Sequence, residues 1–207
     1  MAPHQAGSNR DGQIAMSLPS SIRDMLDRTT LIIASNRGPI EFHETSNGEI
    51  VSKRGTGGVI TAMSAAARYA EAIWVACAMT PTDRLLAEQM RQRQEPFIDH
   101  PDLEGFHVRF VLPDPEAYRG YYNRIANPLL WFLQHYLWDT PRAPDIDYQT
   151  WQAWYNGYVV VNRLFAEEIV AAADAAPREP IVLLQDYHLY LTPTFIREQR
   201  PDLLLYH

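Results

Sequence analysis

Aromatic and amide side chains gather in one short segment, where an ordinary core helix would carry aliphatic residues. The segment contains Tyr121, Tyr122, Asn123, Asn127 and Trp131. Aromatic rings stack on the C–H faces of sugars, while amides and phenols form hydrogen bonds with hydroxyl groups. Aromatic residues at helical spacing are also typical of a packed core. The segment therefore predicts either a wall that binds a polyhydroxylated ligand or an aromatic core helix.

An arginine and a pair of glycines follow the first apolar run of the chain, residues 31–35. The guanidinium of Arg37 could bind a phosphate, or it could lie in an exposed turn. Gly57 and Gly58 could bring backbone N–H groups close to a diphosphate at a helix N-terminus, or they could form a flexible turn. Their spacing matches neither the dinucleotide fingerprint nor the P-loop, which speaks against a nicotinamide-dependent dehydrogenase.

Asp186 lies two residues after another apolar run, which ends at Leu184, and it is the candidate catalytic residue. Its carboxylate could orient a substrate hydroxyl or accept its proton, and an aspartate at this place could equally cap a helix. We interpret His188 as a structural residue, because no other His, Cys or carboxylate lies at metal-ligand spacing around it. His135 lies in the aromatic segment and is interpreted as a packing residue. No metal site is predicted.

Alternating strands and helices must position these residues. Strands are expected at residues 31–35, 74–78, 107–112, 180–184 and 203–206. Helices are expected at residues 59–72, 81–94, 118–138, 151–173 and 189–199, and a hairpin over residues 40–54 turns at Asn47-Gly48. This order predicts an α/β fold with a doubly wound, mostly parallel sheet, whose ligands lie beyond the carboxyl ends of the strands.

Composition restricts the classes of protein and partner. The chain has 207 residues, of which 46% are hydrophobic and 21% charged, so it can bury one sizeable core. A net charge of -7 disfavours nucleic acid and anionic membranes as partners. The single cysteine, Cys77, has no partner for an internal disulfide, and no apolar run is long enough to span a membrane. A cytoplasmic location is expected.

The chain is expected to divide into an arm and one domain. Residues 1–28 begin with a stretch rich in Gly, Ser, Asn and Gln, whose burial could not offset its ordering entropy, and they are predicted to form a flexible arm. Residues 29–207 hold all the predicted strands and form the domain.

Several motifs, taken in order, resemble the trehalose-6-phosphate synthase family of GT-B glycosyltransferases. These motifs are Ser35-Asn36-Arg37, Gly57-Gly58, Tyr121-Tyr122-Asn123, Leu130-Trp131, His135-Tyr136, Val161-Asn162 and Asp186-Tyr187-His188-Leu189. The resemblance covers nearly everything from Leu31 to the end of the chain. It implies the Rossmann-like amino-terminal domain of a GT-B glycosyltransferase, truncated before the donor domain.

The resemblance also implies a role for each candidate residue. Arg37, Tyr122 and Trp131 would hold the phosphorylated acceptor sugar, and Asp186 would contact the reacting sugar near its hydroxyls. The backbone of Gly57-Gly58 would meet the diphosphate of the donor. The family reaction moves glucose from UDP- or GDP-glucose to glucose 6-phosphate with retention at the anomeric carbon, and it implies neither a metal nor a cofactor. The expected partners are these two substrates and, as an open alternative, a second copy of the chain.

Two departures from the family pattern leave alternatives open. Residues 76–80 replace the Gly- and Ser-containing turn of the family, which points to another phosphorylated acceptor, a glycoside or a cyclitol. The sequence ends at His207, before the family's active-site histidine is expected, so His207 is left out of the predicted site. This fragment alone is expected to be inactive. The alternative interpretation is a non-catalytic module that binds a sugar phosphate or has a regulatory role.

Overall fold

The structure, a computed structural model, describes residues 19–207 except 56–57, 68, 104 and 138–145. Its centre is a parallel five-stranded sheet with the order β5-β4-β1-β6-β7. The strands are β1 Thr29–Ser35, β4 Glu71–Cys77, β5 Phe106–Val111, β6 Glu179–Leu184 and β7 Leu204–Tyr206. Because the chain moves outward in both directions from β1, this is the doubly wound sheet that the sequence predicts.

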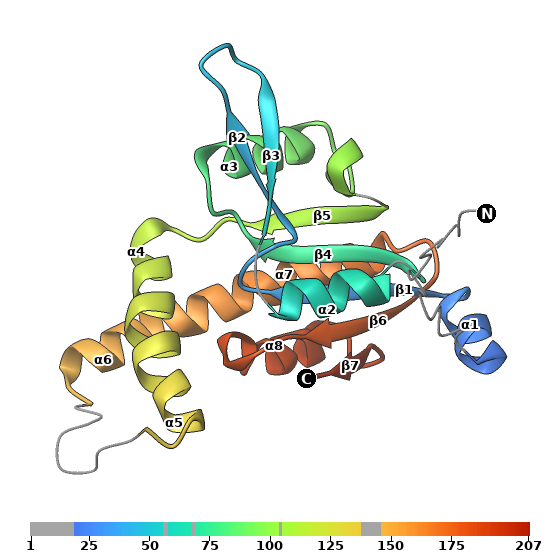
Figure 1. Ribbon diagram of the computed structural model, residues 1–207. Coiled ribbons are helices and arrows are strands. Elements are labelled where there is room, and N and C mark those ends of the chain that lie inside the picture. The colour runs from blue at the N-terminus through green and yellow to red at the C-terminus, as the bar shows by residue number, and fades with distance from the viewer. Residues whose placement is uncertain (1–18, 56–57, 68, 104, 138–145) are drawn as a thin grey trace, which may run out of the picture.

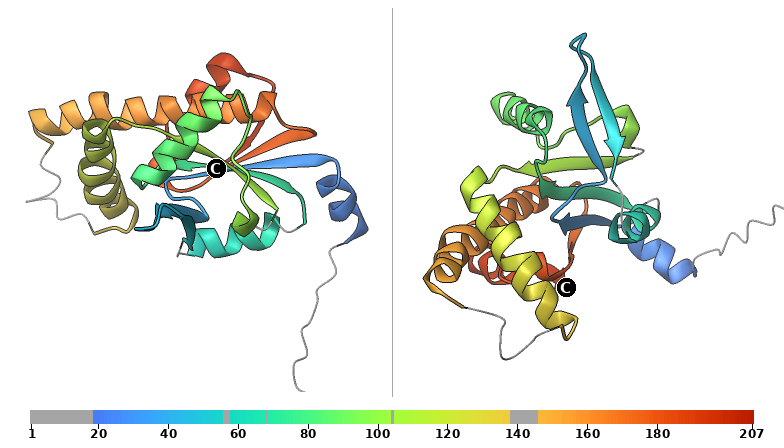
Figure 2. Two further views of the ribbon diagram at one scale, coloured as in Figure 1. Left: turned by 90° about the horizontal axis from the view of Figure 1, so that it is seen from above. Right: turned by 60° about the vertical axis from the view of Figure 1, so that its left-hand side comes forward.

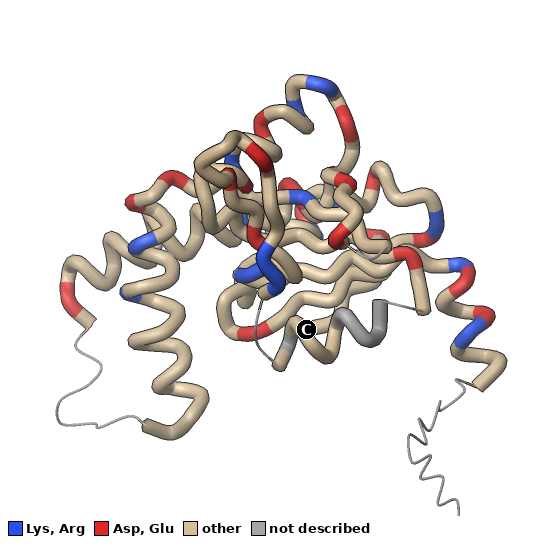
Figure 3. Tube along the Cα trace, turned by 45° about the horizontal axis from the view of Figure 1, so that its top comes forward, with Lys and Arg blue, Asp and Glu red and all other residues tan. Residues whose placement is uncertain are grey.

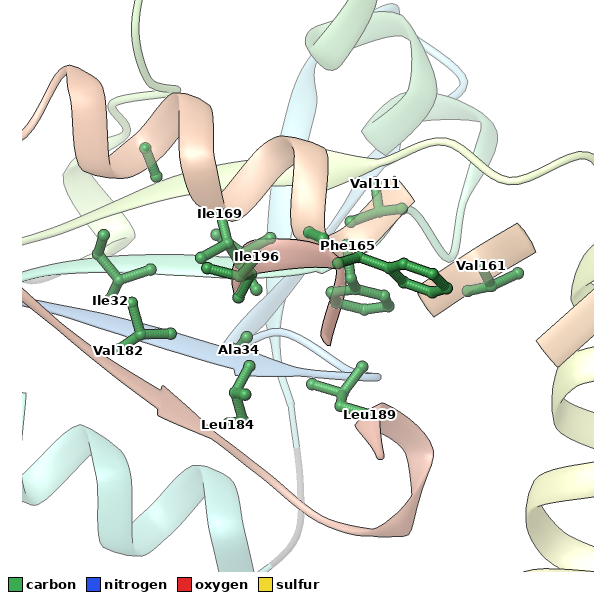
Figure 4. Packing of buried hydrophobic residues seen from close by; sticks show 14 of the residues in the cluster. Ile32, Ala34, Val111, Val161, Phe165, Ile169, Val182, Leu184, Leu189 and Ile196 are labelled. Atoms are coloured by element: carbon green, nitrogen blue, oxygen red, sulfur yellow. The ribbon is translucent and has the colours of Figure 1, made fainter. Parts of the chain in front are cut away.

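Helices cover both faces of the sheet because the central strands are apolar on both sides (Figure 2). One face packs against α7 (Val159–Asp174) and α8 (Thr192–Gln199), with Phe165, Ile169 and Ile196 in its core (Figure 4). The opposite face packs against α2 (Gly58–Ala67). Helix α3 (Pro81–Gln92) adds Ala87 and Met90 to the second core.

A hairpin of β2 (Ile40–Glu44) and β3 (Ile50–Arg54) extends away from the sheet (Figure 1). Gly48 has a φ of 79°, a conformation that glycine adopts without strain, so the predicted turn at Asn47-Gly48 is confirmed. The other predicted elements are present as well, with ends that differ by a few residues. Helix α8, for example, begins at Thr192 rather than at 189, because the 3₁₀ turn η4 (Tyr187–Leu189) precedes it.

The aromatic segment forms a column that stands beside the sheet (Figure 1). It consists of α4 (Pro115–Tyr118), the π-helix η2 (Arg119–Trp131) and α5 (Phe132–Gln134). The sequence predicts a helix here but does not predict its π winding. The column crosses α6 (Tyr148–Ala153) and a second π turn, η3 (Trp154–Tyr158), where Gly157 lies so close that an added Cβ would be 2.6 Å from the backbone nitrogen of Tyr121.

The amino-terminal part of the predicted arm, residues 1–18, lies outside the described residues. Within the described part of that arm, Ser20–Leu26 forms helix α1, which buries none of its residues. Cys77 is buried, and burial raises the pKa of its thiol. In the described part of the chain, no helix is long and apolar enough to cross a membrane.

Candidate functional site

The carboxyl ends of two neighbouring strands bring Arg37 and Asp186 to the same edge of the sheet. Strand β1 ends just before Arg37 and β6 just before Asp186, and the two strands pair in parallel. The backbone N–H of Gln185 donates to the oxygen of Ala34 at 2.9 Å, which continues the ladder to the residue before Asp186. The two segments that the sequence identifies as chemical therefore start side by side.

Asp186 has a backbone conformation that L-residues rarely adopt, with φ 72° and ψ 165°. This region is almost restricted to glycine, and a side chain held there costs about 1–3 kcal/mol. Its Oδ1 accepts a hydrogen bond from the N–H of Tyr187 at 2.8 Å, so Asp186 also caps η4. Capping alone does not require such a conformation, because Ser, Asn or Asp cap helices in the extended region.

The Asp186 carboxyl is held in its charged form. Burial raises its pKa, but the close His188 ring, the hydrogen bond from the N–H of Tyr187 and the nearby His207 together outweigh burial and lower the pKa below its ordinary value. An ionised carboxylate accepts hydrogen bonds and donates none. The ring of His207, which the sequence left outside the site, lies with Nε2 3.2 Å from the backbone oxygen of Asp186.

The π winding of η2 assembles the wall opposite Asp186. Tyr118, Tyr122, Asn127 and Trp131 recur at steps of four, five and four residues. A π-helix, with hydrogen bonds from i to i+5, takes about 4.4 residues per turn, so these four positions share one stripe. In an α-helix of about 3.6 residues per turn, Asn127 would lie half a turn away from Tyr118.

The side chains of this stripe contact η4. Tyr122 stacks on Tyr118, with ring centroids 5.6 Å apart, and on His188 at 5.7 Å. The hydroxyl of Tyr187 donates to Oδ1 of Asn127 at 3.0 Å. These contacts fix the wall against the turn that carries Asp186.

A pocket of about 470 Å³ opens between the wall and η4. Its lining residues are Asn127, Pro128, Trp131, Phe132 and Tyr187. Trp131 is backed by His135, whose ring stacks on it at 4.3 Å and whose Nδ1 lies 2.7 Å from the backbone oxygen of Trp131. His135 therefore packs as predicted. The lower part of the column carries no Lys, Arg, Asp or Glu (Figure 3).

Arg37 is held loosely compared with the residues around it. Its side chain is 54% exposed, and its Nη1 lies 3.8 Å from Oε1 of Glu41. The turn beneath it is firmly bonded, because the Ser35 hydroxyl donates to the Arg37 backbone oxygen at 2.6 Å. Asn36 connects this turn to the wall, with its Nδ2 3.3 Å from the hydroxyl of Tyr118. The guanidinium therefore stands at the rim of the site.

The glycine-rich loop meets the same turn. Gly57 lies outside the described residues, and Gly58 opens α2 with open space around the position of a Cβ. The glycine that sequence reasoning missed is Gly55, whose N–H donates to the oxygen of Pro39 at 2.8 Å. A Cβ on Gly55 would lie 2.6 Å from the oxygen of Gly38, so only glycine fits there. Gly55 is thus held against the Arg37 turn.

Asn162 is the supporting residue to which the sequence assigned no function. It is fully buried, and its Nδ2 donates to the backbone oxygens of Tyr158 and His188 at 2.9 and 3.1 Å. Its Oδ1 accepts from the N–H groups of Leu191 and Thr192. An asparagine in the apolar stripe of α7 is the signal that could have identified it, since a buried amide needs partners.

Comparison with known proteins decides the family. The sequence model of glycosyltransferase family 20 matches residues 29–207. The chain belongs to this family. The trehalose-6-phosphate synthase of Mycobacterium avium is 32% identical over 174 residues, which cover 84% of this chain and 32% of that protein. An Arabidopsis thaliana alpha,alpha-trehalose-phosphate synthase (UDP-forming) is 28% identical over 92% of this chain and 20% of its own length.

Solved structures of this glycosyltransferase family share the fold. An Escherichia coli structure, described as bound with UDP-2-fluoro glucose, matches with a TM-score of 0.55 and 17% identity over 85% of this chain and 32% of its own. A Burkholderia xenovorans alpha,alpha-trehalose-phosphate synthase in complex with glucose-6-phosphate matches with a TM-score of 0.54 and 15% identity, over the same shares. The chain therefore has the GT-B type of α/β fold and spans about a third of the length of these relatives.

Proposed function

We propose that this chain is the acceptor-side domain of a retaining glycosyltransferase that moves glucose from UDP- or GDP-glucose to glucose 6-phosphate. The observation that carries the proposal is the strained, ionised Asp186 at the carboxyl end of β6, whose neighbour Tyr187 lines an aromatic pocket together with Trp131. Strain of this kind persists where surrounding structure enforces it and is concentrated at functional sites. The ligands named for the solved family members support the choice of substrates.

Each residue has a task in this proposal. The guanidinium of Arg37 pairs with the phosphate of the acceptor, and the rings of Tyr122 and Trp131 pack against its sugar. The Asp186 carboxylate accepts a hydrogen bond from an acceptor hydroxyl and holds it in place for attack. The backbone at Gly57 and Gly58 donates N–H groups to the donor's diphosphate.

In the transfer step, the bond between the anomeric carbon and the diphosphate breaks and a bond to the acceptor oxygen forms on the same face of the sugar. The proton of the acceptor hydroxyl passes to the departing diphosphate oxygen, so charge and atoms balance. Positive groups and N–H donors stabilise the charge that develops on the leaving group. The donor nucleotide would be held by a second domain, as expected from the share of the relatives that this chain covers.

A specific contact favours a second acceptor class, a phosphorylated glycoside or cyclitol. Residues 76–80 form the end of β4 and the segment after it at the same edge of the sheet, and they place the sulfur of Met79 3.6 Å from the hydroxyl of Tyr118. A thioether replaces small polar groups beside the wall, which reduces the hydrogen bonds that it offers to an acceptor.

Calorimetry of the 207-residue chain tests the proposal. We expect glucose 6-phosphate to bind, glucose to bind at least tenfold more weakly, and Arg37→Ala to abolish this preference, since a hydrogen bond to a charged group contributes about 1.5–3 kcal/mol. Trp131→Ala should weaken the binding of both ligands. Arg93→Ala and Trp151→Ala are matched controls, because these residues are exposed and lie outside the site.

Three results distinguish the alternatives. Binding of a phosphorylated glycoside or cyclitol in preference to glucose 6-phosphate would support the second acceptor class. Tight binding by a full-length chain that transfers no glucose would support the non-catalytic module. Equal binding of glucose and glucose 6-phosphate by the folded chain would overturn the assignment of Arg37.

A further inference from the structure

His188 lies in a stack of aromatic rings directly behind the Asp186 carboxylate. Its side chain is only 10% exposed. The ring stacks on Tyr187, at 4.3 Å and 28°, and on Tyr122, at 5.7 Å and 16°. The ring cannot swing away from its position without losing these two contacts. The orientation of His188 is therefore fixed by residues of the wall and of η4.

The two ring nitrogens of His188 have different surroundings. Nδ1 lies 3.6 Å from Oδ2 of Asp186. Nε2 is buried and has no hydrogen-bond partner within the described residues. A carboxylate oxygen beside Nδ1 favours the proton on that nitrogen, which leaves Nε2 without an N–H to satisfy. The arrangement fits one tautomer, with Nδ1–H directed at Asp186.

The contact with His188 Nδ1 is made by Oδ2, the Asp186 oxygen that does not bond the N–H of Tyr187. Oδ1 already accepts the N–H of Tyr187 at 2.8 Å, so the carboxylate can still turn about that bond. A donor at Oδ2 removes this freedom, and the remaining lone pairs stay available for a substrate hydroxyl. The 3.6 Å separation is longer than a hydrogen bond, and catalytic contacts of this kind tighten when the ligand binds.

We propose that His188 is a positioning residue, which orients the Asp186 carboxylate toward the acceptor hydroxyl through Nδ1–H. Its role toward the acceptor rests on the proposed function, whereas its hold on Asp186 does not. The backbone supports this role, because the oxygen of His188 accepts a hydrogen bond from Asn162 and the oxygen of Tyr187 accepts one from the hydroxyl of Tyr158 at 2.5 Å.

The test compares His188→Asn with His188→Gln. The amide of asparagine can place an N–H where Nδ1 is, while glutamine places it near Nε2. The first readout is the pKa of Asp186. It is measured by an NMR titration of the chain labelled with ¹³C at the aspartate carboxyl groups, and the Asp186 signal is assigned by its absence in Asp186→Asn. Among the described residues, the titratable side chains that lower the Asp186 pKa are His188 and His207, and the Asp186 carboxylate in turn raises the pKa values of Tyr121, Tyr158, Tyr187 and Tyr190.

Because His207 is present in both variants, their difference isolates position 188. The tyrosine pKa values are raised, so these hydroxyls stay neutral throughout the titration. We expect the Asp186 pKa to stay low in His188→Asn and to rise in His188→Gln. Tyr121→Phe, which removes a buried hydroxyl from the same ring cluster without touching Asp186, should leave the Asp186 pKa unchanged.

Binding of glucose 6-phosphate is the second readout, expected to fall at least tenfold in His188→Gln and less than threefold in His188→Asn. Equal Asp186 pKa values in the wild-type chain and in both variants would overturn the proposal. A pKa difference without any binding of glucose 6-phosphate would support the positioning role and contradict the proposed acceptor. The comparison of two folded polar variants also avoids a large apolar substitution in the stack.

Discussion

The turns after β1 and after β6 start side by side, yet they hold their charged residues in opposite ways. Asp186 has a glycine-like backbone, a capping hydrogen bond and an aromatic stack behind it. Arg37 has a regular backbone turn and an exposed side chain with one distant acidic neighbour. The carboxylate is held in one place without a ligand, whereas the guanidinium retains rotamer freedom, which the phosphate of the proposed acceptor would restrict on binding.

The difference shows that, in the part of the chain that the structure describes, stabilising contacts act on the Asp186 turn far more than on the Arg37 side chain. Strain at Asp186 persists because Asn162 and Tyr158 bond the backbone of η4 and fix its path. Nothing comparable acts on the Arg37 side chain among the described residues. Fixed geometry suits a group that orients a reacting hydroxyl, and an adjustable cation suits a group that captures a charged ligand.

The largest effect is expected from removal of the support beneath η4. Asn162→Ala leaves several buried backbone groups without a partner and should lower the free energy of unfolding by about 3–5 kcal/mol. Urea denaturation followed by circular dichroism measures it. Asn156→Ala is the matched control, because that amide is exposed and bonds only Gln152 among the contacts described; its effect should stay within about 0.5 kcal/mol. A decrease in unfolding free energy of less than 1 kcal/mol in Asn162→Ala would mean that Asn162 does not support the Asp186 turn.

Glycine and alanine substitutions should have opposite relative effects on stability at Asp186 and at Arg37. At Asp186, Gly should give a chain about 1 kcal/mol more stable than Ala, because Ala keeps the strained φ while Gly relieves it. At Arg37, which is not among the described residues with positive φ, Ala should be the more stable by about 0.5 kcal/mol. The measurement is the midpoint of urea denaturation for all four variants. The same order at both positions would argue against strain at Asp186.

Removal of the arginine side chain should change stability very little. Arg37→Ala is expected to shift the free energy of unfolding by less than about 0.5 kcal/mol, because an exposed ion pair at 3.8 Å contributes little. Denaturation of this variant accompanies the calorimetry described above. A loss of 2 kcal/mol or more would mean that Arg37 stabilises the turn rather than serving a ligand.

The smallest expected effect is the dependence of stability on pH through Asp186. Since folding lowers the pKa of Asp186, its charged form contributes stability that is fully present above the unfolded pKa of about 3.9 and is lost as pH falls through the folded pKa. Asp186→Asn lacks this contribution. The difference in unfolding free energy between the wild-type chain and this variant should therefore narrow as the pH is lowered from 6 to below 4. A constant difference over that range would contradict the lowered pKa.

Sequence patterns predicted the sheet because the cores of β1, β4 and β6 are uninterrupted apolar runs, and β5 is rich in β-branched and aromatic residues. The hairpin followed from Asn47-Gly48, a local signal that needs no tertiary context. Asp186 and Trp131 became candidates by residue type and by resemblance, and their roles stay predictions. The strain at Asp186, the closeness of Gly55 to Gly38 and the support from Asn162 were not, because each depends on contacts between segments far apart in the chain.

The winding of η2 was also beyond the sequence, and it affects how this segment should be aligned with relatives. A relative with one residue fewer between Tyr122 and Asn127 would space the four wall residues at steps of four. An α-helix presents positions four apart on one slowly drifting stripe. The same wall can thus be built with either winding. A one-residue gap in an alignment of this segment would then mark a change of helix type, with the ligand surface conserved across it.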